Sequence, residues 1–113
     1  MEYAIENEYL IVTVTTWGAQ VKSVVRKFDD VEHMWQADKS VWGYHAPILF
    51  PHTGKVVDDL IETKGEVYQA KQHGFARLME HTLVRQTEDT IVMELRSSEE
   101  TLLIFPYAFR LIS

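Results

Sequence analysis

Residues 10–16 read LIVTVTT, and the spacing of their side chains decides the fold class. Leu10, Val12 and Val14 fall on one side of an extended chain, while Ile11 and Thr13 fall on the other. A period of two is typical of a β-strand with one buried face, whereas a helix repeats its apolar residues every three to four positions. This stretch therefore predicts a strand.

The same period recurs along the rest of the chain. It predicts a strand in AQVKSVVRKF, residues 19–28, after a turn at Gly18, and a hairpin over residues 59–70. The hairpin turn is Lys64–Gly65, because glycine tolerates the positive φ that tight turns require. A second hairpin is predicted over residues 81–98, and a last strand in YAFRLIS, residues 107–113. The pattern predicts an all-β protein, an antiparallel β-sandwich.

Composition limits the classes of partner. The 113 residues carry a net charge of -6 and 46% hydrophobic side chains, which suits one modest packed domain. No run of lysine or arginine is present, so we expect neither nucleic acid nor a membrane surface as a partner. The absence of cysteine and of a signal pattern at the amino terminus leads us to expect a cytoplasmic protein.

Two stretches lack a period of their own, APILFPHTGKVVDD at residues 46–59 and KQHGFAR at residues 71–77. The HTGK within the first is not a phosphate loop, because Leu49 stands where that motif needs glycine and Val56 where it needs a hydroxyl. The five histidines are scattered along the chain, so we expect no metal centre and no cofactor. A strand-turn-helix serine elbow is not written either.

These two stretches, together with GAQVKSVVRK at residues 18–27 and EHMWQAD at residues 32–38, resemble the aldose 1-epimerase (galactose mutarotase) family, in its lactose-operon-associated branch. The resemblance covers essentially the whole chain. It implies that residues 1–113 are a single partial domain, the amino-terminal portion of a large antiparallel β-supersandwich. The apolar alternation that continues to the last residues also suggests a missing continuation, although a terminal strand docked into a sheet would look the same.

The resemblance implies a reaction and a set of site residues. Family members interconvert the α and β anomers of a free hexose or hexose phosphate through ring opening, with an acid at the ring oxygen and a base at the anomeric hydroxyl. His73 matches the family histidine that holds and polarises the sugar, and is the catalytic candidate. Lys55, Arg77 and Gln72 are the substrate-binding candidates. The family base, a glutamate, and the acid, a second histidine, align beyond residue 113, so we expect the 113-residue chain alone to be inactive.

Two of these positions carry information about the ligand. Lys55 stands where the family usually has arginine, and lysine lacks the planar fork that can grip two sugar oxygens at once. Arg77 matches an arginine that contributes to phosphate binding in relatives acting on hexose 6-phosphates, and guanidinium pairs bidentately with phosphate.

Structural roles remain open for each candidate. His73 could be a loop or core residue with a satisfied hydrogen bond, Arg77 a structural cation paired with Glu80 or Asp59, and Lys55 simply solvated. Trp42 and Phe50 could stack on a sugar or belong to the core. We expect structural roles for His45 and His52.

Two classes of function therefore stay open, a sugar epimerase and a non-catalytic carbohydrate-binding or interaction protein on the same fold. We also expect self-association, most simply a homodimer, through unpaired strand edges or a shared apolar face.

Overall fold

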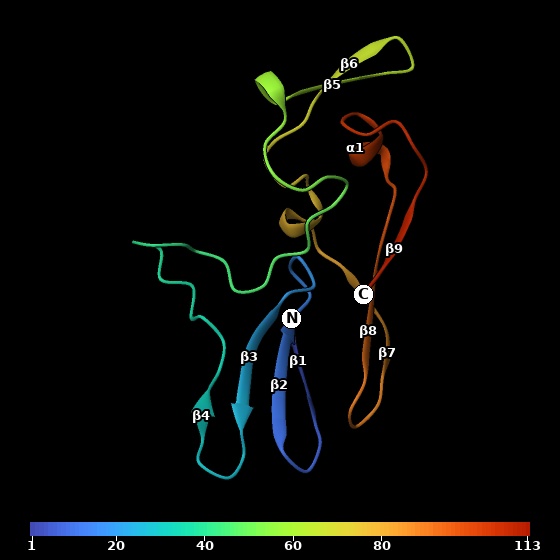
Figure 1. Ribbon diagram of the computed structural model, residues 1–113. Coiled ribbons are helices and arrows are strands. Elements are labelled where there is room, and N and C mark those ends of the chain that lie inside the picture. Colours follow the sequence, from blue (N-terminus) through green and yellow to red (C-terminus); the bar gives the residue numbers. More distant parts are fainter.

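A computed structural model describes residues 1–113, and its strands form three antiparallel sheets (Figure 1). The first sheet holds β1 (Glu2–Glu6), β2 (Leu10–Thr15), β3 (Val21–Arg26) and β4 (Val31–Glu32) in chain order. The pair β5 (Leu60–Thr63) and β6 (Glu66–Gln69) stands alone, and β7 (Thr82–Gln86), β8 (Ile91–Arg96) and β9 (Arg110–Ile112) form the third sheet. The prediction of an all-β antiparallel fold is confirmed.

Three short helical turns complete the structure, namely η1 (Val57–Asp59), η2 (Ala76–Leu78) and the four-residue α1 (Glu99–Leu102). The helix α1, which begins with a capping box between Ser98 and Thr101, was not predicted from the sequence. No helix is both long and apolar enough to cross a bilayer.

The predicted turns lie where the sequence placed them. Gly18 and Ala19 have φ of 70° and 47°, and Lys64 and Gly65 have φ of 52° and 74°. The last strand is shorter than predicted: β9 covers three residues, because the Tyr107 amide donates back to the Phe105 carbonyl at 2.9 Å and the chain turns there instead of extending. The prediction also missed β1, which pairs with β2 along its whole length.

The core lies where the first sheet packs on the third. Val14 of β2 and Met93 of β8 are 5% and 1% exposed and belong to one apolar cluster. A second cluster contains Phe75, Ala76 and Leu95. Ile48 packs against both clusters, so the loop of residues 46–59 joins the two halves of the core.

The molecule is flat and extended. Its principal extents are 56 × 33 × 17 Å and its radius of gyration is 16.3 Å, whereas a compact domain of this length has a radius of about 13 Å. Its accessible surface is 7469 Å², roughly 1,000 Å² above the value expected for a monomer of this mass. The surplus surface includes many large apolar side chains, among them Phe28, Val41, Val57, Leu103 and Ile112.

Candidate functional site

His73 lies in the loop between β6 and η2, and this loop is tied to the loop of residues 46–59. The backbone N–H of Gly54 donates to His73 Nδ1 at 2.8 Å, and the backbone N–H of His73 donates to the Gly54 carbonyl at 2.9 Å. His73 itself adopts a left-handed φ of 65°. The structure therefore brings the two non-periodic stretches of the sequence together at this histidine.

The pair of hydrogen bonds fixes the state of the imidazole. A backbone N–H can only donate, so Nδ1 must accept, and in the neutral ring the proton then resides on Nε2. His73 is half-buried, and no other bond engages Nε2 within the chain. The ring consequently offers a single oriented N–H donor.

Gly74 holds this loop against the core. It has a φ of 72° and forms a parallel bridge with Phe50, whose carbonyl accepts the backbone N–H groups of Phe75 at 2.9 Å and Ala76 at 3.2 Å. A Cβ at Gly74 would lie 2.1 Å from that carbonyl oxygen. Phe50 in turn packs edge-on against Phe75, so the His73 loop is anchored on the aromatic core.

Arg77 follows the loop and forms no ion pair with a carboxylate, neither Glu80 nor Asp59. Its Nη2 donates to the Gln72 carbonyl at 3.1 Å, and its guanidinium carbon lies 4.6 Å from the centre of the Tyr44 ring. The Tyr44 contact could not be found from the sequence, because it joins residues 33 positions apart with no shared motif. Arg77 braces the backbone beside His73 and keeps its charge uncompensated by any carboxylate.

The other two candidates are exposed. The side chains of Lys55 and Gln72 form neither a hydrogen bond nor an ion pair within the chain. Lys55 directly follows Gly54, so it belongs to the same loop contact as His73. The structure thus places His73, Lys55 and Gln72 on two adjoining loops, and Arg77 in η2 directly after the second loop.

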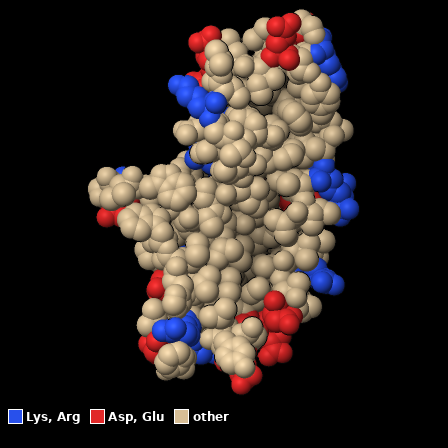
Figure 2. All heavy atoms as spheres, in the orientation of Figure 1, with Lys and Arg blue, Asp and Glu red and all other residues tan.

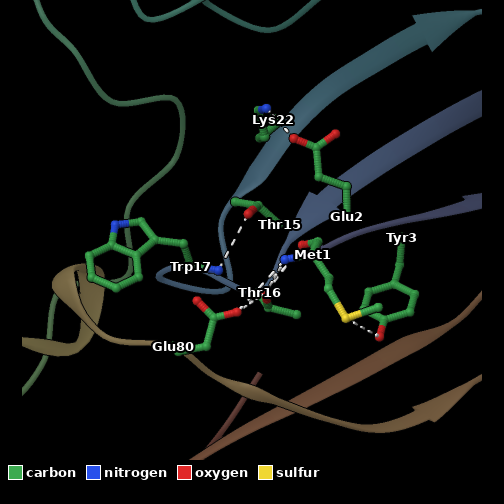
Figure 3. Close-up of polar contacts among 8 residues, drawn as sticks. All are labelled: Met1, Glu2, Tyr3, Thr15, Thr16, Trp17, Lys22 and Glu80. Atoms are coloured by element: carbon green, nitrogen blue, oxygen red, sulfur yellow. Dashed lines mark hydrogen bonds and ion pairs between the residues drawn. The ribbon is translucent and has the colours of Figure 1, made fainter.

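The segment after η2 is fixed to the end of β2 (Figure 3). The Thr16 hydroxyl donates to a Glu80 carboxylate oxygen and accepts from the amino-terminal ammonium at 2.8 Å. The backbone N–H of His81 donates to the Thr16 carbonyl at 2.8 Å, and Gly18 N–H donates to the Met79 carbonyl at 2.7 Å. These bonds set the position of η2, and therefore of Arg77, against the first sheet.

The remaining histidines make other contacts. Nδ1 of His45 donates to the Trp35 carbonyl at 2.8 Å, and Nε2 of the buried His81 donates to the Ala76 carbonyl at 2.9 Å. The ring nitrogens of His52 are buried without a hydrogen-bond partner. No group of three or more His, Asp or Glu side chains is arranged to hold a metal ion.

A cavity of about 290 Å³ opens beside the loop, and its lining includes Lys71, Gly74, Phe75, Glu100 and Ile104. The imidazole of His73 is not part of its lining. The cavity therefore lies next to the candidate residues without containing them.

Residues 1–112 match the family model described as aldose 1-epimerase. The plasmid and chromosomal LacX proteins of Lactococcus lactis subsp. lactis are each 34% identical over 116 residues. The alignment covers 98% of this chain and 38% of each relative, so the chain spans well under half the length of these relatives.

Solved structures agree with this match. A galactose mutarotase related enzyme from Lactobacillus acidophilus superposes with a TM-score of 0.98 at 38% identity, covering 99% of this chain and 37% of the other. A galactose mutarotase-like protein from Lactobacillus casei ATCC 334 superposes with a TM-score of 0.95 at 33% identity, covering 99% and 38%. The match in both cases extends over nearly all of the present chain.

Proposed function

The chain belongs to the aldose 1-epimerase family, and from this premise we propose that the His73 loop is one wall of a sugar cleft serving the interconversion of α and β anomers of a hexose. The observation that carries the proposal is the pair of bonds between Gly54 and His73. These bonds leave the imidazole one free donor, Nε2–H, and donors aimed at an oxygen that gains charge are what ring opening needs.

The chemistry can be followed atom by atom. A base removes the proton from the anomeric hydroxyl, the bond between C1 and the ring oxygen breaks, and the ring oxygen takes up a proton from an acid. Rotation about the C1–C2 bond of the open chain, followed by ring closure with the proton transfers reversed, yields the other anomer. His73 would donate its Nε2–H to the sugar near the ring oxygen and stabilise the charge that develops there.

We further propose that Lys55, Gln72 and Arg77 bind the substrate. Lys55 and Gln72 have no competing partner within the chain, and Arg77 has no carboxylate partner, with its Nη2 on the Gln72 carbonyl and its Nε buried. An uncompensated guanidinium is suited to a phosphate as well as to hydroxyls, so the substrate class includes hexose phosphates as well as free hexoses.

The 113-residue chain by itself is proposed to be inactive, as the amino-terminal part of a cytoplasmic enzyme domain. No carboxylate forms a bond with His73, and the family resemblance places the base and the second histidine outside these residues. The absence of a carboxylate bonded to His73 also favours a second candidate function, that of a non-catalytic carbohydrate-binding protein.

Polarimetry tests the catalytic proposal. Purified protein at high concentration is expected to leave the mutarotation of α-D-glucose and α-D-galactose at the buffer rate. Acceleration that His73→Ala abolishes, and that His33→Ala at an exposed histidine leaves intact, would show that the complete proton-transfer apparatus lies within these residues.

We also propose that the isolated chain self-associates. Its surplus surface of roughly 1,000 Å² is close to the ~800 Å² that each partner contributes to a standard interface. Sedimentation velocity is expected to show a concentration-dependent shift toward a dimer, and a stable monomer at 100-fold higher concentration would contradict it.

A further inference from the structure

Two tryptophans lie half-exposed in the segment that follows β4. Trp35 is 44% exposed and Trp42 is 45% exposed, with Val41 beside them at 72%. Figure 1 shows this segment leaving β4, running to the left edge of the molecule and returning to the centre, and Figure 2 shows a projection at the same edge. We call residues 35–44 the aromatic arm.

The arm is held in one conformation although it contains no strand or helix. Nε1–H of Trp35 donates to the Trp42 carbonyl at 2.8 Å, and the backbone N–H of Trp42 donates to the Asp38 carbonyl at 2.7 Å. The Trp35 carbonyl in turn accepts from His45. An exposed aromatic surface whose backbone is already fixed loses less entropy when a ligand binds, so this arm is preorganised.

The arm contacts η2, the helical turn that follows the His73 loop. The Tyr44 ring centre lies 5.7 Å from that of Trp42, and the guanidinium carbon of Arg77 lies 4.6 Å from the Tyr44 ring centre. Arg77 donates to the carbonyl of Gln72, the residue before His73. The contacts therefore run without a break from Trp42 to the candidate site.

We propose that Trp42 is a platform on which the apolar face of a pyranose ring stacks, in a subsite that adjoins the His73 loop. A pyranose has C–H groups on its face and hydroxyls at its rim, so an indole covers the face and leaves the hydroxyls to polar neighbours. The subsite rests on the proposed sugar-binding function and adds a residue to it.

Asp38, whose backbone carbonyl accepts the Trp42 N–H, offers a carboxylate within the arm. One oxygen of its carboxylate accepts both the N–H and the hydroxyl of Ser40, at 2.9 and 2.7 Å, and the other oxygen makes no bond within the chain. The bonds from the Ser40 side chain and backbone lower the pKa of Asp38, so it stays an acceptor for sugar hydroxyls at neutral pH. Phe50, the other aromatic considered for stacking, packs 4.9 Å from Phe109 in the core and cannot take this role.

The test is a titration of the 113-residue protein with methyl β-D-galactopyranoside, followed by NMR at the tryptophan indole N–H and at the His73 ring. A methyl glycoside cannot open its ring, so the titration reports binding alone. We expect the signals of Trp42 and His73 to shift together, and Trp42→Ala to weaken binding about tenfold, equivalent to about 1.4 kcal/mol. Trp42→Phe retains an aromatic face and is expected to lose less.

Trp17 is the matched control. It is 49% exposed and lies beside Glu80, on the loop after β2 (Figure 3). Trp17→Ala is expected to leave the affinity for the glycoside within about twofold, because Trp17 lies outside the arm and would lose no contact with the sugar. Equal effects of the two alanine variants would overturn the platform.

The outcomes separate this inference from the proposed function. If the His73 signal shifts and the Trp42 signal does not, the sugar cleft at His73 stands and the Trp42 platform is wrong. If the Trp42 signal shifts and the His73 signal does not, the platform stands and the His73 cleft is wrong. If neither shifts, both are wrong. If the Trp42 signal moves with protein concentration and not with glycoside, the arm is a contact between copies of the chain, and the platform is again refuted.

Discussion

Replacing Gly74 by alanine is expected to release the His73 loop from the core. The residue has a φ of 72°, and an added Cβ would lie 2.1 Å from the Phe50 carbonyl oxygen, 2.4 Å from its carbon and 2.6 Å from Pro51 Cδ. All three neighbours belong to backbone or to a rigid ring, so none can rotate away. Ordinary van der Waals contact begins at 3.4 Å, so the segments that carry Phe50 and Gly74 must separate by about 1.3 Å, the difference between 3.4 and 2.1 Å.

Two costs add in Gly74→Ala. A left-handed φ in an alanine costs roughly 1–2 kcal/mol. The required displacement also breaks the bonds from Phe75 and Ala76 to the Phe50 carbonyl, at about 1 kcal/mol each. The free energy of unfolding should therefore fall by about 3–4 kcal/mol, a large share of the 5–15 kcal/mol typical of a domain.

Gly65→Ala separates the two costs. Gly65 has nearly the same φ, 74°, but nothing lies within 4 Å of its added Cβ. Urea unfolding followed by tryptophan fluorescence should place the midpoint of Gly74→Ala about 1 M below that of Gly65→Ala, for a slope near 1.5 kcal/mol/M. Equal midpoints for the two variants would refute the argument that close approach, and not φ alone, requires glycine at position 74.

Two further perturbations test the core and the electrostatics. Met93→Ala is expected to lower the free energy of unfolding by about 2–5 kcal/mol, because the side chain is 1% exposed and joins the two sheets; urea denaturation measures it, and a loss below about 1 kcal/mol would contradict the assigned core. Bonds from Arg96 and then Arg110 lower the pKa of Glu94 below its usual 4.5, so this carboxylate stabilises the fold above that pH and the gain disappears as the pH falls through the lowered pKa. The difference in free energy of unfolding between the native protein and Glu94→Gln should thus be constant above about pH 5.5 and shrink as the pH falls below it. A difference that persists at acid pH would count against the ion pairs.

Most of the strands could be predicted because their signal is local. The period of two in residues 10–16 reports which neighbouring side chains are buried. The Lys64–Gly65 pair and Gly18 report tight turns in the same local way. The strand β1 and the helix α1 were missed because neither carries a strong apolar pattern of its own. The acidic stretch of β1 becomes a strand through its pairing with β2, and α1 through a two-residue capping box.

The candidate site could be predicted only in part from the sequence. His73, Lys55, Gln72 and Arg77 were singled out by a family motif. The structure places the first three on adjoining loops and Arg77 in η2, which follows them. The structural alternative for Arg77 named Glu80 and Asp59, whereas its partners are the Gln72 carbonyl and the Tyr44 ring. Nothing in the spacing of these residues encodes that contact.

The sequence by itself determined the strand periodicity, the positions of the tight turns and the loop that carries His73, because each depends on residues within a few positions of one another. Only the tertiary structure decided which imidazole nitrogen carries the proton, that Gly74 must be glycine, and that Trp42 stays exposed while Phe50 packs against the aromatic core. Each of these depends on two segments approaching within bonding distance. That approach is set by how the two sheets pack and not by either segment alone.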